Sequence, residues 1–446
     1  MTTKDKPFQQ GNLYAWFVVF VLCLTSIFAY LDRQIINLLV EPIKLTLGIN
    51  DTQIGLLQGV SFALLYVIAA IPIAWAADFG NRTRIISIGI ICWALATFSC
   101  GLATTFMFMF IARTIVGLGE ATLTPSGYSL IGDYFQTEKV GLAISFFTGS
   151  GFLGAGLAYI IGGQIIGILS QSDFYTLPLI GTAEPWQVAF MTVAIPGLLL
   201  VGIMQFVKEP PRQSTVSADF AKLRARESFA ALFNYISSNR RLYIGLFFGL
   251  AIMASATFSL MNWTPVYFTR KFGGTAQQVG TVFGSIVLFS SPLAVFSGGF
   301  IATYFMGKGR HGANIYVPIA ASLLAVIFTY LFCNAPNGQV ATWLAVPAVF
   351  FSAMPFGCGT ATLPLITPNR LRAQVVALYL LCANLLGLSL GPTAVGAITD
   401  YVYKDPTQIG KALGIVAPIL FICGALILTY AIKPYCTIIR SQSANY

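Results

Sequence analysis

The sequence predicts an all-α membrane protein with twelve transmembrane helices in two pseudo-symmetric six-helix halves. Of its 446 residues, 57% are hydrophobic and only 9% are charged, whereas a soluble domain carries roughly 25% charged residues. The apolar residues form long continuous runs. This excludes a transmembrane barrel, whose strands alternate over about 10 residues. One long basic segment near the middle separates six runs from six others.

Each apolar run is long enough to cross a bilayer, which requires about 20 residues. The basic residues Lys4 and Lys6 precede the first run, but this run is too long for a signal peptide and lacks a small-residue cleavage site. It is therefore predicted to be the first membrane helix. The predicted spans are residues 14–40, 53–78, 84–104, 106–134, 139–168, 186–208, 242–268, 275–304, 314–334, 339–366, 371–400 and 409–433.

The spans are predicted to form an N-terminal half (1–207) and a C-terminal half with a short tail (242–446), joined by a cytoplasmic linker (208–241). In the linker, an amphipathic segment near Asp219–Tyr235 could be a surface helix at the lipid headgroups or part of a solvated linker. The fourth run contains Gly117-Leu-Gly119-Glu120-Ala-Thr-Leu, and the tenth contains Gly357-Cys-Gly359-Thr360-Ala-Thr-Leu. Such duplicated halves are usual in alternating-access carriers, with the site between them at the midplane.

The net charge of +10 is concentrated on one side of the membrane. With both termini in the cytoplasm, eighteen of the twenty-five Lys and Arg residues lie in or beside cytoplasmic segments, five lie outside and two lie within helices. This positive-inside bias sets the orientation of the helices and gives no reason to expect a nucleic-acid partner. The tight loops and short tail favour a bacterial inner membrane, and the protein is predicted to be a monomer.

Only four charged residues are predicted to lie deep in the membrane. Asp32 and Arg33 are in the first run, and Arg113 and Glu120 are in the fourth. A charge at the bilayer centre costs about 2.5–3.5 kcal/mol on insertion scales, so these side chains should face the bundle interior and find partners. The predicted arrangement pairs Arg33 with Glu120 and leaves Asp32 near Arg113 or another polar group.

Two roles are open for these four charges. A static ion-pair network would hold helices together, but buried pairs stabilise poorly because desolvation cancels much of the attraction. A proton-coupling site would use Asp32 and Glu120 as titratable groups, because apolar surroundings favour the neutral carboxyl and a nearby Arg favours the ionised form. Separating Arg33 from Glu120 would then make Glu120 take up a proton, so the second role explains the charges better.

The sequence also offers candidates for a cavity lining and argues against catalysis. It has no Walker loop, nucleophile elbow or HExxH motif. The single histidine, His311, and the eight scattered cysteines lack metal-ligand spacing. We therefore predict no enzyme activity, no cofactor and no metal. The candidate cavity residues, for each of which ordinary packing is an alternative, are Tyr30, Phe147, Asn262, Trp263, Thr360 and Asn384.

Two motifs resemble those of the major facilitator superfamily. The loop Asp78-Phe79-Gly80-Asn81-Arg82-Thr83-Arg84 resembles its signature loop, and Arg113-x3-Gly117-x-Gly119-Glu120 resembles its fourth-helix motif. The superfamily usually has Gly where this chain has Ala74, and the second-half copy of the loop has Thr303 in place of the Asp. The resemblance implies a cytoplasmic gate formed by Asp78, Gly80, Arg82 and Arg84 with Glu138, Lys139 and the start of the eleventh helix near Arg372 and Ala373.

Within the superfamily, Asp32-Arg33 and the Arg113–Glu120 motif resemble the Spinster family, whose eukaryotic members export lysolipids and sphingosine phosphate. The resemblance implies proton linkage at Asp32 and Glu120, and coupling or headgroup binding at Arg33 and Arg113. The expected function is proton-coupled secondary transport of a lysolipid-like or other amphipathic anionic solute by alternating access. An organic-acid or sugar symporter and a non-transporting receptor or scaffold are alternatives; a channel is disfavoured because no pore ring of like charges is evident.

Overall fold

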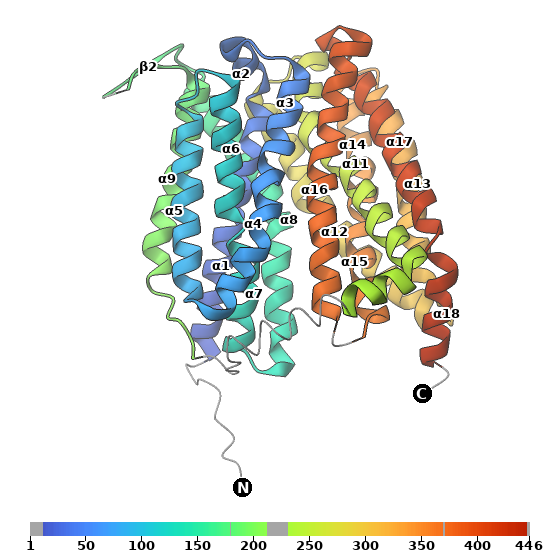
Figure 1. Cartoon of the computed structure of the whole chain (residues 1–446). Coiled ribbons are helices and arrows are strands. Elements are labelled where there is room, and N and C mark those ends of the chain that lie inside the picture. The colour runs from blue at the N-terminus through green and yellow to red at the C-terminus, as the bar shows by residue number, and fades with distance from the viewer. Residues whose placement is uncertain (1–11, 179, 212–230, 369–370, 444–446) are drawn as a thin grey trace. The chain divides into compact units, whose positions relative to one another are not determined.

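The computed structural model is almost entirely helical (Figure 1). It describes residues 12–178, 180–211, 231–368 and 371–443. Within these residues, twelve helical segments are long and apolar enough to cross a membrane. The predicted fold class is therefore confirmed, and each segment coincides with one predicted apolar run.

The chain divides into two compact units. One unit comprises Met1–Thr215 and Gly274–Leu288, and the other comprises Val216–Gly273 and Phe289–Tyr446. The helix α12 (Ala276–Gly307) begins in the first unit and continues into the second. The assignment of residues to units therefore follows contacts in space and does not break at a single point in the chain.

The first unit is built from the helices of spans one to six. Within it, α1 packs against α8 and α9, α5 packs against α6 and α9, and α4 packs against α6. Its elements are α1 (Asn12–Gln34), η1 (Ile35–Leu38), α2 (Val40–Leu47), α3 (Asp51–Gln58), α4 (Val60–Phe79), α5 (Arg82–Cys100), α6 (Phe106–Glu120), α7 (Leu123–Tyr134), α8 (Thr137–Leu169), β1 (Tyr175–Leu177), β2 (Gly181–Ala183) and α9 (Pro185–Met204).

Two spans of the first unit are interrupted. Gly59 has φ −120° and ψ −75° and separates α3 from α4, so the second span consists of two helices. The fourth span is interrupted at Ala121 and Thr122, and the Thr122 hydroxyl donates to the Gly119 carbonyl at 2.8 Å. As a result, Glu120 is the last residue of α6 and lies in the middle of its span.

A small hairpin precedes the sixth span. Its strands β1 and β2 pair antiparallel with Thr176 opposite Thr182, and they lie at the end of the first unit away from α7 (Figure 1). The strands are only three residues long, too short to produce an alternating pattern that the sequence could reveal. The following helix α9 starts with a capping box between Glu184 and Gln187 and has Pro185 at its first position.

The second unit contains spans seven and nine to twelve and most of α12. Within it, α11 packs against α16 and α17, and α13 packs against α14, α15 and α17. Its elements are α11 (Arg240–Phe272), α13 (Ala313–Cys333), α14 (Gly338–Ala353), α15 (Pro355–Ile366), α16 (Arg372–Ala397), the π-helix η2 (Ile398–Tyr403), the 3₁₀ helix η3 (Pro406–Gln408), α17 (Ile409–Thr429) and α18 (Ile432–Ser443).

The glycine repeated between the halves serves close helix packing in both units. A Cβ atom at Gly117 of α6 would lie 2.2 Å from the Phe62 carbonyl oxygen of α4. At Gly357 of α15, a Cβ atom would lie 1.9 Å from the Val295 carbonyl oxygen of α12. In each unit, therefore, the fourth span approaches the second span at a point where no larger residue fits.

The predicted amphipathic segment Asp219–Tyr235 lies largely outside the described residues. Residues 231–238 are helical, with Leu232 buried and Phe233 74% exposed. The Tyr235 hydroxyl donates to the Ile366 carbonyl at 3.0 Å and so connects this helix to the end of α15. The part of the linker that is described thus rests on the second unit by one face only.

Candidate functional site

The ion pair predicted between the first and fourth spans is present. An Nη atom of Arg33, in the last turn of α1, donates to Oε2 of Glu120 at the end of α6. The Glu120 side chain is 2% exposed and the Arg33 side chain 15% exposed. The pair is therefore buried on the carboxylate side and reachable on the guanidinium side.

Aromatic rings surround the Arg33 guanidinium. Its central carbon lies 4.0 Å from the ring centre of Phe62, 5.0 Å from that of Tyr30 and 5.9 Å from that of Tyr66. Phe62 and Tyr66 belong to α4 and stack on each other with their ring centres 5.3 Å apart. Because ring faces attract cations, these contacts help to hold the charge in apolar surroundings.

Arg113 holds the end of the first helix. Its two Nη atoms donate to the carbonyl oxygens of Asp32 and Arg33, each at 3.0 Å. Carbonyls in the last turn of a helix lack intrahelical partners, and here α1 gives way to the 3₁₀ turn η1. Arg113 has no exposed surface, so in this structure it fixes the backbone that carries Asp32 and Arg33.

The glycines of the fourth-helix motif place these charges. Gly117 lets α6 touch α4 next to Phe62, as described above. A Cβ atom at Gly119 would lie 2.7 Å from the Trp93 amide nitrogen and 2.8 Å from the Gly89 carbonyl oxygen, both on α5. Because α6 approaches two neighbours this closely, Glu120 is brought within hydrogen-bond reach of α1.

The four membrane charges retain buried atoms without a hydrogen-bond partner in the described part of the chain. These are Oδ2 of Asp32, Oε1 of Glu120 and the Nε atoms of Arg33 and Arg113. Asp32 is 2% exposed and meets Arg113 through its main-chain carbonyl. Each of the two carboxyl groups thus has one oxygen without a hydrogen-bond partner among the described residues.

The signature loop forms a second charged cluster, with Arg82 at its centre. Arg82 is 1% exposed and pairs with Asp133 at the end of α7 and, through Nε at 2.6 Å, with Glu209 after α9. It also donates to the Ser129 hydroxyl at 2.9 Å. These contacts connect the start of α5 with the ends of two other spans in the first unit.

The resemblance predicted that Asp78, Arg82 and Arg84 together pair with Glu138, Lys139 and the start of the eleventh helix. It did not name Asp133 or Glu209, the two acidic partners that Arg82 has in the structure. Glu138 and Lys139 are exposed in the first turn of α8, and their pairing with the loop stays a prediction.

The remaining residues of the predicted gate have varied positions. Gly80 ends α4, and a Cβ atom there would lie 2.8 Å from the Ala76 carbonyl oxygen. Asp78 and Arg84 are exposed, as is Arg372 at the first position of α16. The side chain of Ala373 lies outside the described residues. Contacts between the loop and the start of α16 stay a prediction.

The predicted cavity residues fall into two groups. Phe147 is 5% exposed and packs edge-on against Tyr128 with ring centres 5.5 Å apart, while Trp263 is fully buried and donates from Nε1 to the Pro392 carbonyl at 2.9 Å. Both serve packing in this structure. Tyr30 and Asn384 are partly exposed and Asn262 is 5% exposed. The Thr360 side chain lies outside the described residues.

The arrangement of these motifs agrees with a comparison to protein families. A model described as Major Facilitator Superfamily matches residues 22–392. The chain belongs to the major facilitator superfamily. This is a family of transporters, so the chain is a multi-pass membrane transporter and not an enzyme.

Curated relatives include spinster proteins and transporters that are named for different substrates. Protein spinster homolog 3 of Danio rerio is 25% identical and is matched over 88% of this chain and 78% of its own. "Sphingosine-1-phosphate transporter SPNS2" of Mus musculus is 24% identical over 86% and 70%. "Probable galactarate/D-glucarate transporter GudP" of Bacillus subtilis is 26% identical over 78% and 76%. The resemblance to Spinster proteins is thereby confirmed.

Solved structures of major facilitator transporters share the fold. A bacterial homologue of the human lysosomal transporter Spinster, in an inward-facing and unoccupied conformation, superposes with a TM-score of 0.75 at 24% identity, covering 96% of this chain and 98% of its own. The nucleoside transporter NupG superposes with a TM-score of 0.72 at 14% identity, covering 92% and 99%. At these identities, the superpositions establish the architecture alone.

Four residues of the two clusters were missed from sequence. Phe62 and Tyr66 contact Arg33, and Asp133 and Glu209 contact Arg82. A signal existed for the second pair, because Asp133 is at the end of one apolar run and Glu209 directly follows another, and both runs end on the same membrane side as the signature loop. No signal marked Phe62 or Tyr66, since the chain contains 36 Phe and 19 Tyr residues and most of them serve packing.

Proposed function

We propose that this transporter is proton-coupled and carries a lysolipid-like or other amphipathic anionic solute by alternating access. The observation that carries the proposal is the Arg33–Glu120 pair, which is buried on the acid side and partly exposed on the base side. A pair that served only to join helices would gain nothing from one exposed partner. An arginine that leaves Glu120 to bind a substrate anion needs that exposure.

The proposed coupling step is a competition for Arg33. An anionic headgroup that binds the guanidinium would draw it from Glu120. The carboxylate would then be buried without its counter-ion, and such a group favours the protonated form. Uptake of a proton by Glu120 and binding of the anion by Arg33 therefore support each other. Asp32, with one oxygen free of hydrogen bonds, is proposed as a second proton acceptor.

The surroundings of Arg33 favour an amphipathic solute. Phe62, Tyr66 and Tyr30 provide apolar surface beside the cation, and an anion with an attached hydrocarbon would bury that surface while meeting the charge. One relative is named as a sphingosine-1-phosphate transporter, which supports the same substrate class. Arg113 is fully buried, so headgroup binding is assigned to Arg33 alone.

A second candidate function is transport of a sugar acid or another small organic acid. The similarity to the protein named as a galactarate/D-glucarate transporter favours it. An Arg clamp on a carboxylate would use the same guanidinium. The two candidates differ in whether the aromatic residues beside Arg33 are needed for binding.

The proposed location is a bacterial inner membrane with both termini in the cytoplasm. In this orientation the Arg82 cluster and the linker face the cytoplasm, and the hairpin β1–β2 faces outward. The distribution of Lys and Arg supports the orientation. We propose that the transporter acts as a monomer and that Asp78, Gly80, Arg82 and Arg84 belong to a cytoplasmic gate.

The proposal is tested with purified protein in nanodiscs and a fluorescent lysophospholipid. Saturable binding that differs between pH 5 and pH 8 is expected for the unmodified chain, and binding that no longer responds to pH is expected for Glu120→Gln. Phe62→Ala should weaken binding of the lysolipid and leave binding of galactarate unaffected. Binding of galactarate, measured directly by isothermal titration calorimetry, with no lysolipid binding at either pH, would favour the organic-acid candidate. Absence of both, with intact helicity, would favour a receptor or scaffold.

A further inference from the structure

A crevice in the second unit lies outside the site described above. Its volume is about 340 Å³, which falls within the 300–1,000 Å³ range of small-molecule pockets. Ile301 and Phe305 of α12, one face of α13 and Phe351 of α14 form its walls. Arg310, in the turn between α12 and α13, is the one charged residue among those that line it.

The crevice follows α13 along one face. Ala313, Tyr316, Val317, Ala320, Ala321 and Leu324 line it, and their spacing of three and four residues is that of a single helix stripe. Eleven residue steps of 1.5 Å give a length of about 16 Å. Half of a hydrocarbon core about 30 Å thick is about 15 Å, so the crevice matches the depth of one leaflet.

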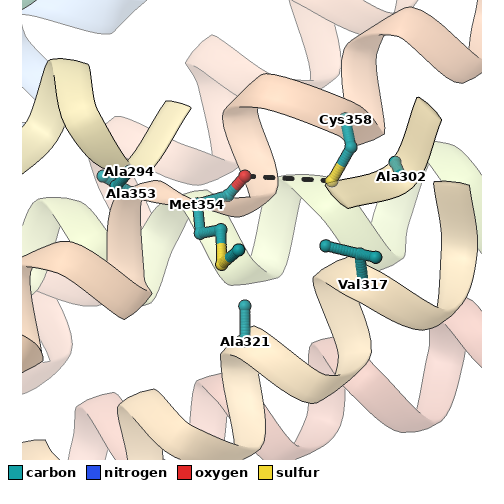
Figure 2. Close-up of a cluster of buried hydrophobic side chains, with 7 residues drawn as sticks. All are labelled: Ala294, Ala302, Val317, Ala321, Ala353, Met354 and Cys358. Atoms are coloured by element: carbon teal, nitrogen blue, oxygen red, sulfur yellow. Dashed lines mark hydrogen bonds between the residues drawn. The ribbon is translucent and has the colours of Figure 1, made fainter. Parts of the chain in front are cut away.

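Small side chains create the space. The floor is formed by Ala321, which is 2% exposed, and by Val317 and Met354. These three residues belong to the buried cluster in Figure 2, where Met354 and Ala321 lie next to each other. The rim is open, since Tyr316 is 49% exposed and Leu324 is 39% exposed. In a membrane span, such open apolar surface faces lipid chains.

The charged end of the crevice is fixed by the turn that follows α12. Gly309 has φ +77°, the left-handed conformation that commonly ends helices, and the Arg310 amide donates to the Phe305 carbonyl at 3.0 Å. The Arg310 guanidinium lies 5.3 Å from the Phe305 ring centre. Lys308 precedes the turn and His311 follows it, so the end of the crevice is basic.

The helices around this basic end offer no carboxylate. The sequence contains no Asp or Glu between Glu227 and Asp400, a stretch that includes α11 to α16. An anion at Arg310 would therefore meet no repulsion from these helices. In the orientation proposed above, the turn lies at the cytoplasmic leaflet, where anionic lipids give a negative surface potential that attracts Lys and Arg.

We propose that this crevice binds one acyl chain of an anionic glycerophospholipid, with the lipid phosphate at Arg310. The apolar stripe of one-leaflet length accommodates the hydrocarbon chain, and the basic turn at its end accommodates the headgroup. The bound lipid is distinct from the transported solute, because none of the crevice residues belongs to the Arg33–Glu120 site. A second copy of this chain on the same face would need a complementary acidic surface, which α11 to α16 lack.

The test is native mass spectrometry of the purified full-length chain with added phosphatidylglycerol, phosphatidylcholine or glycerol 3-phosphate. Phosphatidylglycerol should bind more tightly than phosphatidylcholine, and glycerol 3-phosphate should not compete. Arg310→Gln should weaken the binding of phosphatidylglycerol by about fivefold, which is the contribution of one basic residue near an anionic surface. Ala320→Trp, at an exposed position of the stripe, should abolish retention of the lipid.

The matched control is Arg440→Gln, which removes an exposed arginine from α18 outside the crevice and should leave lipid binding unchanged. If Arg310→Gln and Arg440→Gln weakened the binding of phosphatidylglycerol equally, the proposal would be overturned, because the lipid would be attracted by net charge only. Competition by glycerol 3-phosphate would overturn it in favour of a free-phosphate site. A dimer mass lost in Ala320→Trp would assign the crevice to a second copy of the chain.

Discussion

At the level of single residues, the two arginines of the membrane cluster have different contacts, although both lie within predicted membrane spans. Arg33 meets a carboxylate and three aromatic rings and keeps 15% exposure. Arg113 meets two backbone carbonyls and is fully buried. The difference arises because Arg33 lies in the last turn of α1, whereas Arg113 lies in the middle of α6.

Replacement of Glu120 by Gln tests the proton site. The amide keeps the size of the side chain and cannot ionise, so we expect Glu120→Gln to lose substrate transport driven by a proton gradient in proteoliposomes. The control Asp173→Asn removes an acidic group that is exposed before the hairpin and should transport normally. Gradient-driven flux at the unmodified rate in Glu120→Gln would contradict the assignment.

Replacement of Gly117 by Val tests the packing that places Glu120. A Cβ atom would lie 2.2 Å from the Phe62 carbonyl oxygen, so α4 and α6 must separate. Overpacking of this kind typically reduces the free energy of unfolding by about 1–3 kcal/mol, which a lower thermal unfolding temperature in detergent would reveal. The control Gly149→Ala adds a Cβ atom that meets nothing within 4 Å and should unfold no earlier than the original chain.

At the level of elements, the cluster depends on helices that stop inside the membrane. α6 ends at Glu120 and α1 ends at Gln34, so carbonyl groups at both ends need partners within the protein rather than from water. Arg113 provides two donors to α1. The interrupted helices thus create polar groups at the depth where the charged side chains meet.

Replacement of Arg113 by Gln should loosen the end of α1. Each hydrogen bond from a charged group contributes about 1.5–3 kcal/mol, and this variant loses the guanidinium group that donates two of them. We expect faster amide hydrogen exchange in Ile35–Leu38 and a lower unfolding temperature. Arg241→Gln, at an exposed position of α11, is the control. If exchange in Ile35–Leu38 stays unchanged while transport is lost, Arg113 acts on the substrate rather than on the helix end.

At the level of the whole molecule, the basic residues orient the twelve spans. The proposed orientation puts the hairpin outside and α18 inside. In a background without native cysteines, Thr182→Cys should react with a membrane-impermeant maleimide added to intact cells. Ser441→Cys should react only after the cells are opened. The reverse pattern would show that the positive-inside rule fails for this chain.

The sequence by itself determined the number of spans, the fold class and the identity of the membrane charges. These follow from properties of short stretches, because lipid demands continuous apolar helices and a charge within one is exceptional. The pairing of Arg33 with Glu120 was also predictable, since few partners exist at that depth.

Only the tertiary structure decided which of many similar residues contact Arg33 and Arg82. Phe62 and Tyr66 beside Arg33, and Asp133 and Glu209 beside Arg82, depend on how closely the helices approach and how they are rotated. Those distances are set by glycines such as Gly117 and Gly119, which permit contact without specifying with which helix. The same holds for the crevice along α13, which exists because the alanines on that face of α13 do not fill the space beside α12 and α14. Span number is a local property of the chain, whereas contacts and cavities belong to the packed helices together.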